Sequence, residues 1–288
     1  MAAEHIEAAS ARPGSGLWDA LSLLEWRLRR VIKRPLYALY ERRLAAQSRE
    51  WCKPQHVGII MDGNRRFARS ARMSRLVDGH RAGADRLHKV IEWCDEFGVR
   101  VVTVWALSLD NLGRGPQELE ELFALITLKL REFADHPMVH RRKVRLRYIG
   151  RPDGLPDELR AAIAYAESAT ADHDGLILNV ALGYGGREEI TDAFRAHIRR
   201  QAEMGQSAAA IADSLEPDCV DSYLYNAGLP EPELIMRTSG ELRLSGFLLW
   251  QSVYSEFYFC DVFWPDFRRV DFLRALRAFH RRQRRFGR

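Results

Sequence analysis

The stretch Ile59-Ile60-Met61-Asp62-Gly63-Asn64-Arg65-Arg66-Phe67-Ala68-Arg69 decides the fold. The apolar run His56–Met61 predicts a strand that is buried on both faces, as strands of parallel sheets are. The run stops at an acid, a glycine and an asparagine, and basic and aromatic side chains follow directly. In α/β proteins, such a turn between a strand and a helix is where phosphate groups bind.

The side chains after this strand suit an anion that is held with the help of a divalent cation. Gly63 allows backbone N–H groups to approach an anion closely, and arginines 65, 66 and 69 supply positive charge. Asp62 would repel an anion unless a hard cation such as Mg²⁺ bridged the two. A solvated surface turn would have the same residues, and this stretch alone does not decide between the two interpretations.

The composition is that of an ordinary globular protein. The 288 residues are 47% hydrophobic and 29% charged, which permits one large domain or two small ones. The net charge of +5 suits nucleic acid, an anionic membrane or phosphorylated small molecules. No helix-turn-helix, zinc-finger or RNA-binding pattern is present, so a nucleic-acid partner is not expected.

Cysteine usage and hydropathy bear on location. The four cysteines are scattered without a Cys-x-x-Cys pair, which predicts reduced thiols in a cytoplasmic protein and no zinc site. No apolar run reaches the length of a transmembrane helix, and the first residues lack the apolar core of a signal peptide.

Composition and periodicity divide the chain into three parts. Residues 1–16 lack periodicity and predict a disordered tail. Residues 17–50 predict an amphipathic helical extension that Pro35 interrupts, with leucines at helical spacing opposite arginines. This extension suits packing on its own domain, on a partner subunit, or peripherally on the inner face of the plasma membrane. Residues 51–288 contain no linker and predict one domain.

Strand and helix patterns alternate through this domain. The predicted strands are His56–Met61, Val99–Leu107, Val144–Ile149, Leu176–Leu182, Leu234–Arg237 and Phe257–Phe259. The predicted helices are Gly79–Phe97, Pro116–Phe133, Pro156–Ala171, Gly186–Met204, Ser207–Leu215 and Asp271–Arg285. The alternation predicts an α/β domain with a mostly parallel central β-sheet flanked by helices.

Three further polar segments follow predicted strands, where α/β sheets place their sites. Ser108–Arg114 offers neutral hydrogen-bonding groups and one arginine. Gly183–Arg187 is a glycine turn that opens a helix, and it suits either a tight turn or a ligand contact. Arg237–Glu256 begins with two arginines and several hydroxyl groups around a glycine, which suits a second dianion. Surface salt bridges would explain Arg243 alone but not the whole cluster.

These segments together resemble the signature blocks of the cis-prenyltransferases, the undecaprenyl diphosphate synthase family. The blocks are Asp62-Gly63-Asn64-x-Arg66, Ser108-x-x-Asn111-x-x-Arg114, and Arg237-Thr238-x-Gly240-Glu241-x-Arg243-x-Ser245 through Glu256. They stand in the family's order and spacing from about residue 54 onward. The resemblance implies a Mg²⁺-dependent enzyme that condenses isopentenyl diphosphate with an allylic diphosphate, geranyl or farnesyl diphosphate, and releases diphosphate.

The resemblance also implies roles for individual residues. Asp62 would be the essential acid that handles Mg²⁺, Glu256 a second Mg²⁺ ligand, and Asn111 would sit where a proton leaves the condensing carbon. The residues implied for the allylic diphosphate are Gly63, Asn64, Arg65, Arg66, Arg75, His80 and Arg114. Those implied for isopentenyl diphosphate are Arg237, Arg243 and Ser245. The remaining implied substrate-binding residues are Phe67, Ser108, Leu109, Asp110, Leu112 and Leu244. Arg285-Phe286-Gly287 resembles a family tail that reaches a neighbouring active site in a homodimer.

Several positions bear on product length. The positions that depart from long-chain members of the family are Arg65, Phe67, Leu112 and Gly246. These departures resemble the short-chain (2Z,6E)-farnesyl diphosphate synthases, which perform one condensation. Ala106 points the other way, because its small side chain leaves room for further elongation in a tunnel walled by the second strand and the helices on either side of it. A longer decaprenyl- or undecaprenyl-type product therefore stays an alternative.

Two other functions would suit parts of this pattern. A non-catalytic accessory subunit of the same fold would tend to lack the acid and glycine that stand here as Asp62 and Gly63. A nucleotide-binding phosphotransferase would need a Gly-x-x-x-x-Gly-Lys-[Ser/Thr] loop, which the sequence does not contain. Both are less well supported than prenyl transfer.

Overall fold

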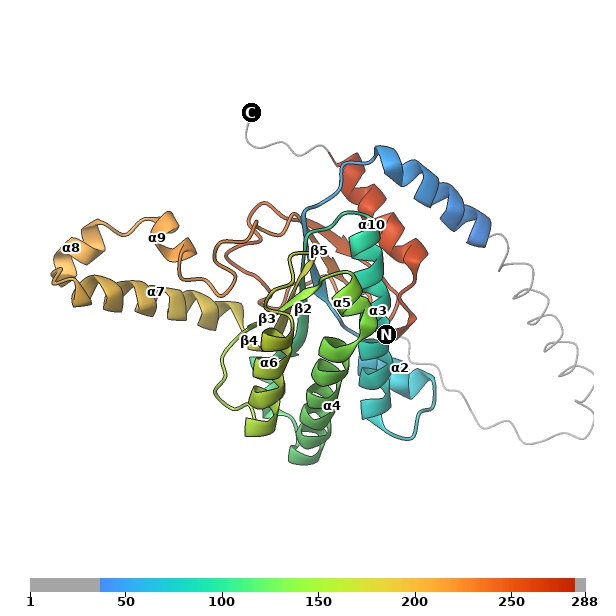
Figure 1. Ribbon diagram of the computed structural model, residues 1–288, viewed down its shortest axis with the longest axis horizontal. Coiled ribbons are helices and arrows are strands. Elements are labelled where there is room, and N and C mark those ends of the chain that lie inside the picture. The colour runs from blue at the N-terminus through green and yellow to red at the C-terminus, as the bar shows by residue number, and fades with distance from the viewer. Residues whose placement is uncertain (1–36, 283–288) are drawn as a thin grey trace, which may run out of the picture. The chain divides into compact units, whose positions relative to one another are not determined.

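The computed structural model describes residues 37–282 (Figure 1). The chain divides into two units between Arg49 and Glu50. In the described part of the first unit, residues 37–47 are helical, and the 3-10 helix η1 (Ser48–Glu50) then spans the boundary. The predicted tail over residues 1–16, the extension up to residue 36, and the predicted Arg285-Phe286-Gly287 tail lie outside the described residues.

The second unit is built on one sheet of six parallel strands. Their order is β3-β4-β2-β1-β5-β6, so the first strand of the chain lies at the centre. The bounds are β1 His56–Ile60, β2 Val101–Ser108, β3 Arg145–Ile149, β4 Ile177–Tyr184, β5 Leu234–Arg237 and β6 Glu256–Phe259. The sheet confirms the predicted fold class, because long apolar runs such as β1 are buried along their whole length.

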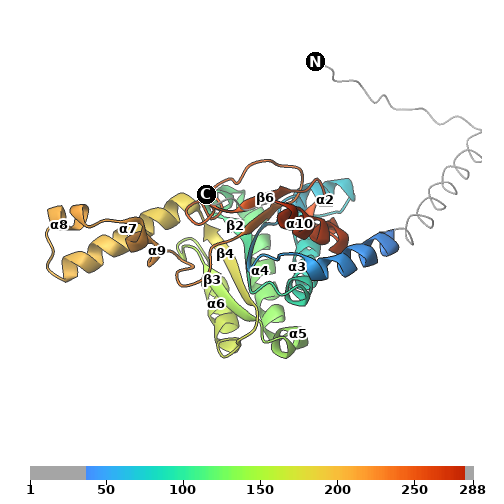
Figure 2. The same cartoon turned by 90° about the horizontal axis from the view of Figure 1, so that it is seen from above.

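Helices flank this sheet. Their bounds are α2 Asn64–Ser70, α3 Leu76–Glu96, α4 Pro116–Asp135, α5 Pro137–Arg141, α6 Asp157–Ala169, α7 Gly186–Glu203, α8 Ala208–Asp213, α9 Pro217–Asp221 and α10 Arg269–Arg281, with 3-10 helices η2 Leu109–Gly113 and η3 Trp264–Asp266. Helix α4 packs against both α3 and α6. Helix α7 projects away from the sheet together with α8 and α9 (Figures 1 and 2). Among the described residues, no helix has the length and apolarity needed to cross a membrane.

Three short helices do not appear in the sequence prediction. Helices α2, α5 and α9 have seven, five and five residues, too few to show an apolar periodicity. Helix α3 begins at Leu76, three residues before the predicted start at Gly79. Close packing of α2 on α3 explains the glycine there, since a Cβ at Gly79 would lie 2.2 Å from the carbonyl oxygen of Asn64.

A buried polar chain crosses the centre of the sheet at the start of β1. The Nδ1 atom of His56 lies 2.6 Å from the Pro230 carbonyl oxygen, which can only accept, so Nδ1 carries the proton. Its Nε2 atom lies 2.7 Å from the Thr103 hydroxyl, which in turn accepts a hydrogen bond from Asn179. Both ring nitrogens therefore have hydrogen-bond partners. Burial lowers the pKa of His56 from 6.5 to about 4, against a smaller opposing effect of the Pro230 hydrogen bond.

This histidine should make the stability of the fold depend on pH. Between pH 6.5 and 4 only the unfolded chain protonates His56, so the stability present above pH 6.5 is lost as the pH falls through this window. We expect the free energy of unfolding to drop by about 2 kcal/mol more between pH 7 and pH 5 in the native chain than in His56→Gln. Urea unfolding at both pH values measures this, and equal losses in the two proteins would contradict it.

Candidate active site

A cavity of about 590 Å³ lies at the carboxyl ends of the central strands. Three segments line most of it: the turn after β1 with the start of α2, the end of β2 with η2, and the loop after β5. The predicted residues that line it are Asp62, Gly63, Asn64, Arg65, Arg66, His80, Ser108, Asp110, Asn111, Arg114, Arg237, Arg243 and Ser245. Parallel strands bring these segments together because their carboxyl ends share one edge of the sheet.

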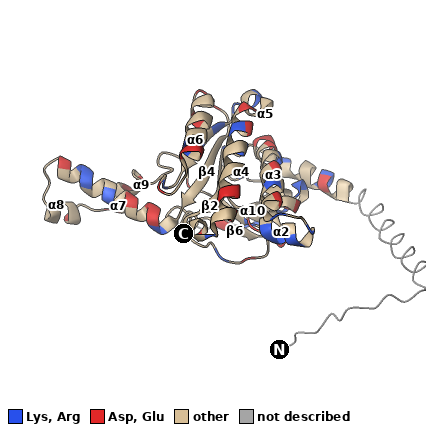
Figure 3. Ribbon diagram, turned by 90° about the horizontal axis from the view of Figure 1, so that it is seen from below, with Lys and Arg blue, Asp and Glu red and all other residues tan. Residues whose placement is uncertain are grey.

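The turn between β1 and α2 depends on glycine. Gly63 has a φ of 101°, a left-handed conformation that other residues adopt at a cost. A Cβ there would also lie 2.8 Å from the Phe263 ring and 2.9 Å from Cβ of Ser239. The turn leads directly into the basic residues gathered on α2 (Figure 3). The chain can therefore place an acid and several arginines within one turn of each other.

Asp62 is held between two arginines. Its Oδ2 atom accepts a hydrogen bond of 2.7 Å from Arg237, and its Oδ1 atom accepts one of 3.3 Å from Arg66. Partial burial raises the pKa of Asp62, but the hydrogen bond and charge of Arg237 and the charge of Arg66 outweigh it, so the pKa lies below its ordinary value. Thr238 fixes the backbone, since its hydroxyl accepts from the Asp62 N–H and donates to the Asp62 carbonyl. Asp62 is thus a positioned, ionised carboxylate.

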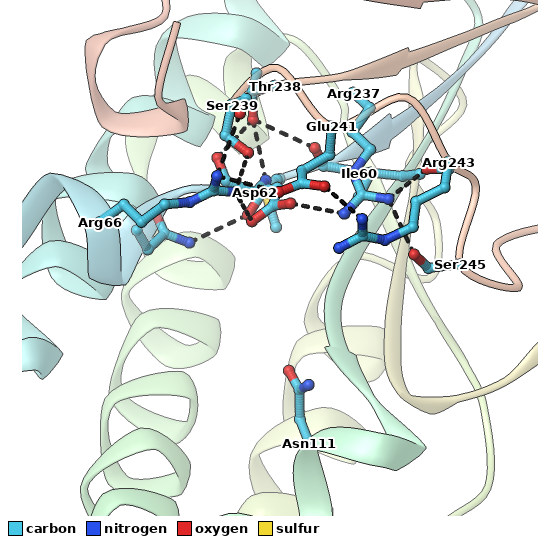
Figure 4. A network of polar contacts seen from close by, with 12 residues as sticks. Ile60, Asp62, Arg66, Asn111, Arg237, Thr238, Ser239, Glu241, Arg243 and Ser245 are labelled. Atoms are coloured by element: carbon cyan, nitrogen blue, oxygen red, sulfur yellow. Dashed lines mark hydrogen bonds and ion pairs between the residues drawn. The ribbon is translucent and has the colours of Figure 1, made fainter. Parts of the chain in front are cut away.

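Arg237 links this acid to the loop after β5. Its side chain is only 7% exposed, and it donates to the Ser245 hydroxyl at 2.9 Å and to the Arg243 carbonyl oxygen. In the same loop, Glu241 pairs with Arg66 at 3.2 Å and with Arg243 at 2.6 Å (Figure 4). Side chains from both ends of the domain sequence are therefore joined around one carboxylate.

The other wall is formed by the end of β2, by η2 and by Arg114 directly after it. The Ser108 hydroxyl accepts the Asn111 N–H at 3.2 Å, which caps η2 and fixes the position of Asn111. The Asn111 carboxamide oxygen accepts a hydrogen bond of 2.8 Å from Arg114. Arg114 and Arg65 both pair with Glu118, at 3.1 and 3.4 Å. Figure 4 shows Asn111 apart from the Asp62 cluster, so the cavity has arginines on two sides.

His80 lies between this cavity and an apolar pocket. Burial first, and then the positive charge of Arg114, lower its pKa from 6.5 to about 4. Its Nε2 atom is buried and has no hydrogen-bond partner among residues 37–282. His80 is therefore neutral at physiological pH and is available to donate or accept one hydrogen bond.

The apolar pocket has a volume of about 100 Å³ and lies between α3 and α4. It shares Met61, Asn64, His80 and Ala106 with the polar cavity, so the two adjoin at these residues. Its other lining residues include Leu87, Leu122, Leu125, Ile126, Leu130 and Phe133. The site as a whole therefore offers a charged chamber next to a hydrocarbon-lined one.

The structure does not bring every predicted residue to the polar cavity. Four of the predicted residues are not among the described residues that line this cavity: Phe67, Leu109, Leu112 and Leu244. Arg75 lines an adjacent cavity that includes His80, and it pairs with Glu121 at 3.0 Å.

Glu256 is the clearest departure from the prediction. In the sheet register it lies beside Leu234, at the amino end of β6, whereas Asp62 follows the carboxyl end of β1. Glu256 pairs instead with Arg282 at 2.6 Å. This chain by itself therefore does not place Glu256 with Asp62 as a second Mg²⁺ ligand.

Other residues of the site are not singled out by the sequence prediction. Glu241 lines the cavity and holds two arginines, and Thr238 positions the acid, although both stand within the quoted motif. Buried Glu189 accepts hydrogen bonds from Tyr184 at 2.5 Å and from Gln251 at 3.0 Å. Gln251 follows the loop of Arg243 and Ser245 in the sequence. Its hydrogen bond to Glu189 therefore fixes the C-terminal end of that loop. Residue types alone did not indicate the anchor.

The glycine turn over residues 183–187 has a structural explanation. The Gly186 N–H donates to the Gly246 carbonyl oxygen at 3.0 Å, and a Cβ on Gly186 would lie 2.4 Å from that oxygen. Residues 183–187 do not occur among the described residues that line the polar cavity. Of the two interpretations of this turn, the tight turn agrees with the structure.

The donor set around Asp62 fits Mg²⁺ when phosphates complete it. No group of three histidine, cysteine or acidic side chains within residues 37–282 could hold a metal ion by itself. Mg²⁺, however, is commonly bound through one or two carboxylates together with substrate phosphates and water. Asp62 is ionised, 28% exposed at its side chain, and faces the cavity. It therefore fits as the single protein ligand of such an ion.

Comparisons with known proteins agree with this geometry. The prenyltransferase family model of undecaprenyl diphosphate synthases matches residues 60–287. An isoprenyl transferase of Deinococcus radiodurans is 51% identical over 86% of this chain and 90% of its own. A (2Z,6E)-farnesyl diphosphate synthase of Thermobifida fusca is 49% identical over 89% of this chain and 99% of its own. The crystal structure of lavandulyl diphosphate synthase from Lavandula x intermedia with dimethylallyl diphosphate superposes with a TM-score of 0.74, at 33% identity, over 82% of this chain and 99% of that one.

Proposed function

Because the chain belongs to the undecaprenyl diphosphate synthase family of prenyltransferases, we propose that it condenses isopentenyl diphosphate with geranyl or farnesyl diphosphate to a Z-configured product. The observation that carries this proposal is the adjoining pair of chambers. Arginines stand on two sides of Asp62 in the polar cavity, and that cavity adjoins a hydrocarbon-lined pocket. Two diphosphates and one growing hydrocarbon chain need such a site.

The arginines divide between the two substrates. Arg65, Arg66 and Arg114 surround the allylic diphosphate, while Arg237, Arg243 and Ser245 bind isopentenyl diphosphate. Planar guanidinium groups make paired hydrogen bonds to phosphate oxygens, and in a partly closed cavity these also stabilise the charge on the departing diphosphate. Asp62 would hold Mg²⁺, which supplies further stabilisation of that charge.

The condensation breaks the bond between the allylic C1 atom and its diphosphate oxygen, and the electron pair leaves with the diphosphate. The double bond of isopentenyl diphosphate attacks C1, so a carbon–carbon bond forms, and the condensing unit then loses a proton to the departing diphosphate as its new double bond forms. Holding both substrates in one cavity supplies the orientation this step needs. Ser108 and Arg114 fix the position of Asn111 through hydrogen bonds. Its carboxamide would lie beside the carbon that loses its proton.

A short product agrees best with the size of the apolar pocket. Its volume of about 100 Å³ is below the ~150 Å³ of a cavity that takes up benzene, so it holds about one isoprenyl group. A pocket of this size favours a short product, such as (2Z,6E)-farnesyl diphosphate, over a long polyprenyl chain. Ala106 favours the alternative of a longer polyprenyl product, since its methyl group at the entrance leaves the way into the pocket open.

The family resemblance extends the proposal to assembly and location. We expect a homodimer in the cytoplasm, with Arg285-Phe286-Gly287 reaching a neighbouring active site. The extension over residues 17–50 would make any peripheral contact with the membrane surface. These features stay predictions.

Incubation with radiolabelled isopentenyl diphosphate tests the proposed reaction. With geranyl or farnesyl diphosphate and Mg²⁺, label should pass into a product that extracts into organic solvent. Chelation of Mg²⁺ with EDTA should abolish this transfer, and added Mg²⁺ should restore it. Absence of labelled lipid with both allylic partners would contradict the proposal.

A further inference from the structure

The loop after β5 contains a serine in a backbone conformation that favours glycine. Ser239 has a φ of 75°, the largest positive value among the described residues other than glycine. Positive φ values are uncommon for residues with a Cβ, and where they persist they cluster at functional sites. Ser239 is 7% exposed, and its backbone N–H donates to the Val262 carbonyl oxygen at 2.9 Å. The chain therefore keeps a buried hydroxyl group where a glycine would adopt the backbone conformation more easily.

That hydroxyl group contacts one of the cavity arginines. The Nη2 atom of Arg66 donates a hydrogen bond of 2.6 Å to Oγ of Ser239 (Figure 4). The bonds from Arg66 to Glu241 at 3.2 Å and to Asp62 at 3.3 Å are longer. A guanidinium group can only donate, so the hydroxyl oxygen is the acceptor. Among the described residues, Ser239 therefore makes the shortest polar contact of the Arg66 guanidinium group.

The glycine turn after β1 makes room for this contact. A Cβ on Gly63 would lie 2.9 Å from Cβ of Ser239 and 2.8 Å from the Phe263 ring. The Cζ atom of Arg66 lies 5.9 Å from the centroid of the same ring, within the range of a cation–π interaction. A hydroxyl group and an aromatic ring that both adjoin Gly63 thus support Arg66.

A neutral partner affects Arg66 differently from a carboxylate. Asp62 and Glu241 offset the positive charge of the guanidinium group, whereas the Ser239 hydroxyl fixes its orientation without adding negative charge. The Arg66 side chain lines the polar cavity and is 41% exposed, so an unsupported side chain would be free to move. Ordering the side chain before a ligand arrives lowers the entropy that binding costs. Arg66 is therefore oriented in advance while its charge stays available to an anion.

We propose that Ser239 is a positioning residue that orients Arg66 toward the allylic diphosphate. The inference rests on the proposed prenyl transfer and adds a residue that is not among the described residues lining the polar cavity. A hydrogen bond to a charged group contributes about tenfold or more to a binding constant. Removal of the hydroxyl should therefore weaken binding of the allylic substrate, while binding of isopentenyl diphosphate should change little.

The direct test removes the hydroxyl and keeps Cβ. In Ser239→Ala, the Kd of geranyl diphosphate from titration calorimetry and its KM should both rise about tenfold, while the KM for isopentenyl diphosphate should stay within about twofold. Ser239→Gly should raise the same Kd equally, although glycine suits the left-handed backbone, and it replaces Ser239→Ala if that variant does not fold. Lys143→Gly is the matched backbone control and should keep native values, because Lys143 also has a positive φ of 51° but lines neither chamber.

A double-mutant cycle shows whether Ser239 acts through Arg66. In an Arg66→Met background, Ser239→Ala should leave the Kd of geranyl diphosphate unchanged, because the donor is absent. Effects that multiply in the double variant, or a native Kd in the folded Ser239 variants, would overturn the assignment. A native chain that binds geranyl diphosphate but forms no labelled lipid would overturn the proposed function, and the Kd values would still decide the role of Ser239. Absence of binding to the native chain would overturn both.

Discussion

Asp62→Asn should lower kcat/KM about a thousandfold. The change keeps the shape of the side chain but removes the charge that Arg237 and Arg66 hold at 2.7 and 3.3 Å. It also removes the one carboxylate that fits Mg²⁺ at the carboxyl end of β1. Removing a single preorganised group that stabilises developing charge typically costs 10²–10³ in rate, and loss of the metal ligand adds to this. Steady-state incorporation of labelled isopentenyl diphosphate measures the effect.

A neutral replacement at a distant acid provides the control. Asp172→Asn lies in the exposed turn after α6 and should leave kcat/KM unchanged. Circular dichroism should show that both variants are folded. Activity of folded Asp62→Asn within tenfold of the native chain would remove the acid from the centre of the mechanism.

Arg237→Lys should lower kcat/KM about a hundredfold, chiefly by raising the KM for isopentenyl diphosphate. Arg237 makes its contacts to Asp62, Ser245 and the Arg243 carbonyl with one planar group, at 7% side-chain exposure. An ammonium group keeps the charge but cannot reproduce this forked geometry. Separate titrations of the two substrates show which KM rises.

Arg243→Lys makes the same chemical change at an exposed position. The Arg243 side chain is 68% exposed and is paired with Glu241 at 2.6 Å, so its replacement should cost about tenfold or less. Equal losses in the two variants would show that burial of Arg237 does not matter. A rise confined to the KM of the allylic substrate would show that the arginines are assigned to the wrong diphosphates.

Local sequence patterns predicted the elements of this fold well. His56–Met61 and Val99–Leu107 are long apolar runs, and runs of this kind can be buried only in a sheet covered on both faces. Both are strands, with bounds shifted by one or two residues. Helix α2 escaped prediction because seven residues with three arginines have no apolar face to recognise.

Strand neighbours and register could not be predicted in the same way. No local pattern indicates that β5 pairs with β1. The contact between Arg237 and Asp62 joins residues that are 175 positions apart in the sequence. Register also explains the outcome for Glu256, which a linear motif places near Arg243 but which the sheet places beside Leu234. Motif spacing thus identified most of the cavity lining. Which end of the sheet each motif residue lies at became clear only from the structure.

The late arrival of β5 has a consequence for synthesis on the ribosome. The chain is made from its N-terminus onward, and a domain generally folds as a unit. A nascent chain that stopped before Arg237 would possess the acid of the centre, yet neither Arg237 nor the loop that carries Glu241 and Ser245. The pairing of β5 with β1 therefore completes the charged chamber only after about four-fifths of the residues have been translated. Incomplete translation products lack a working centre, however well their first strands have folded.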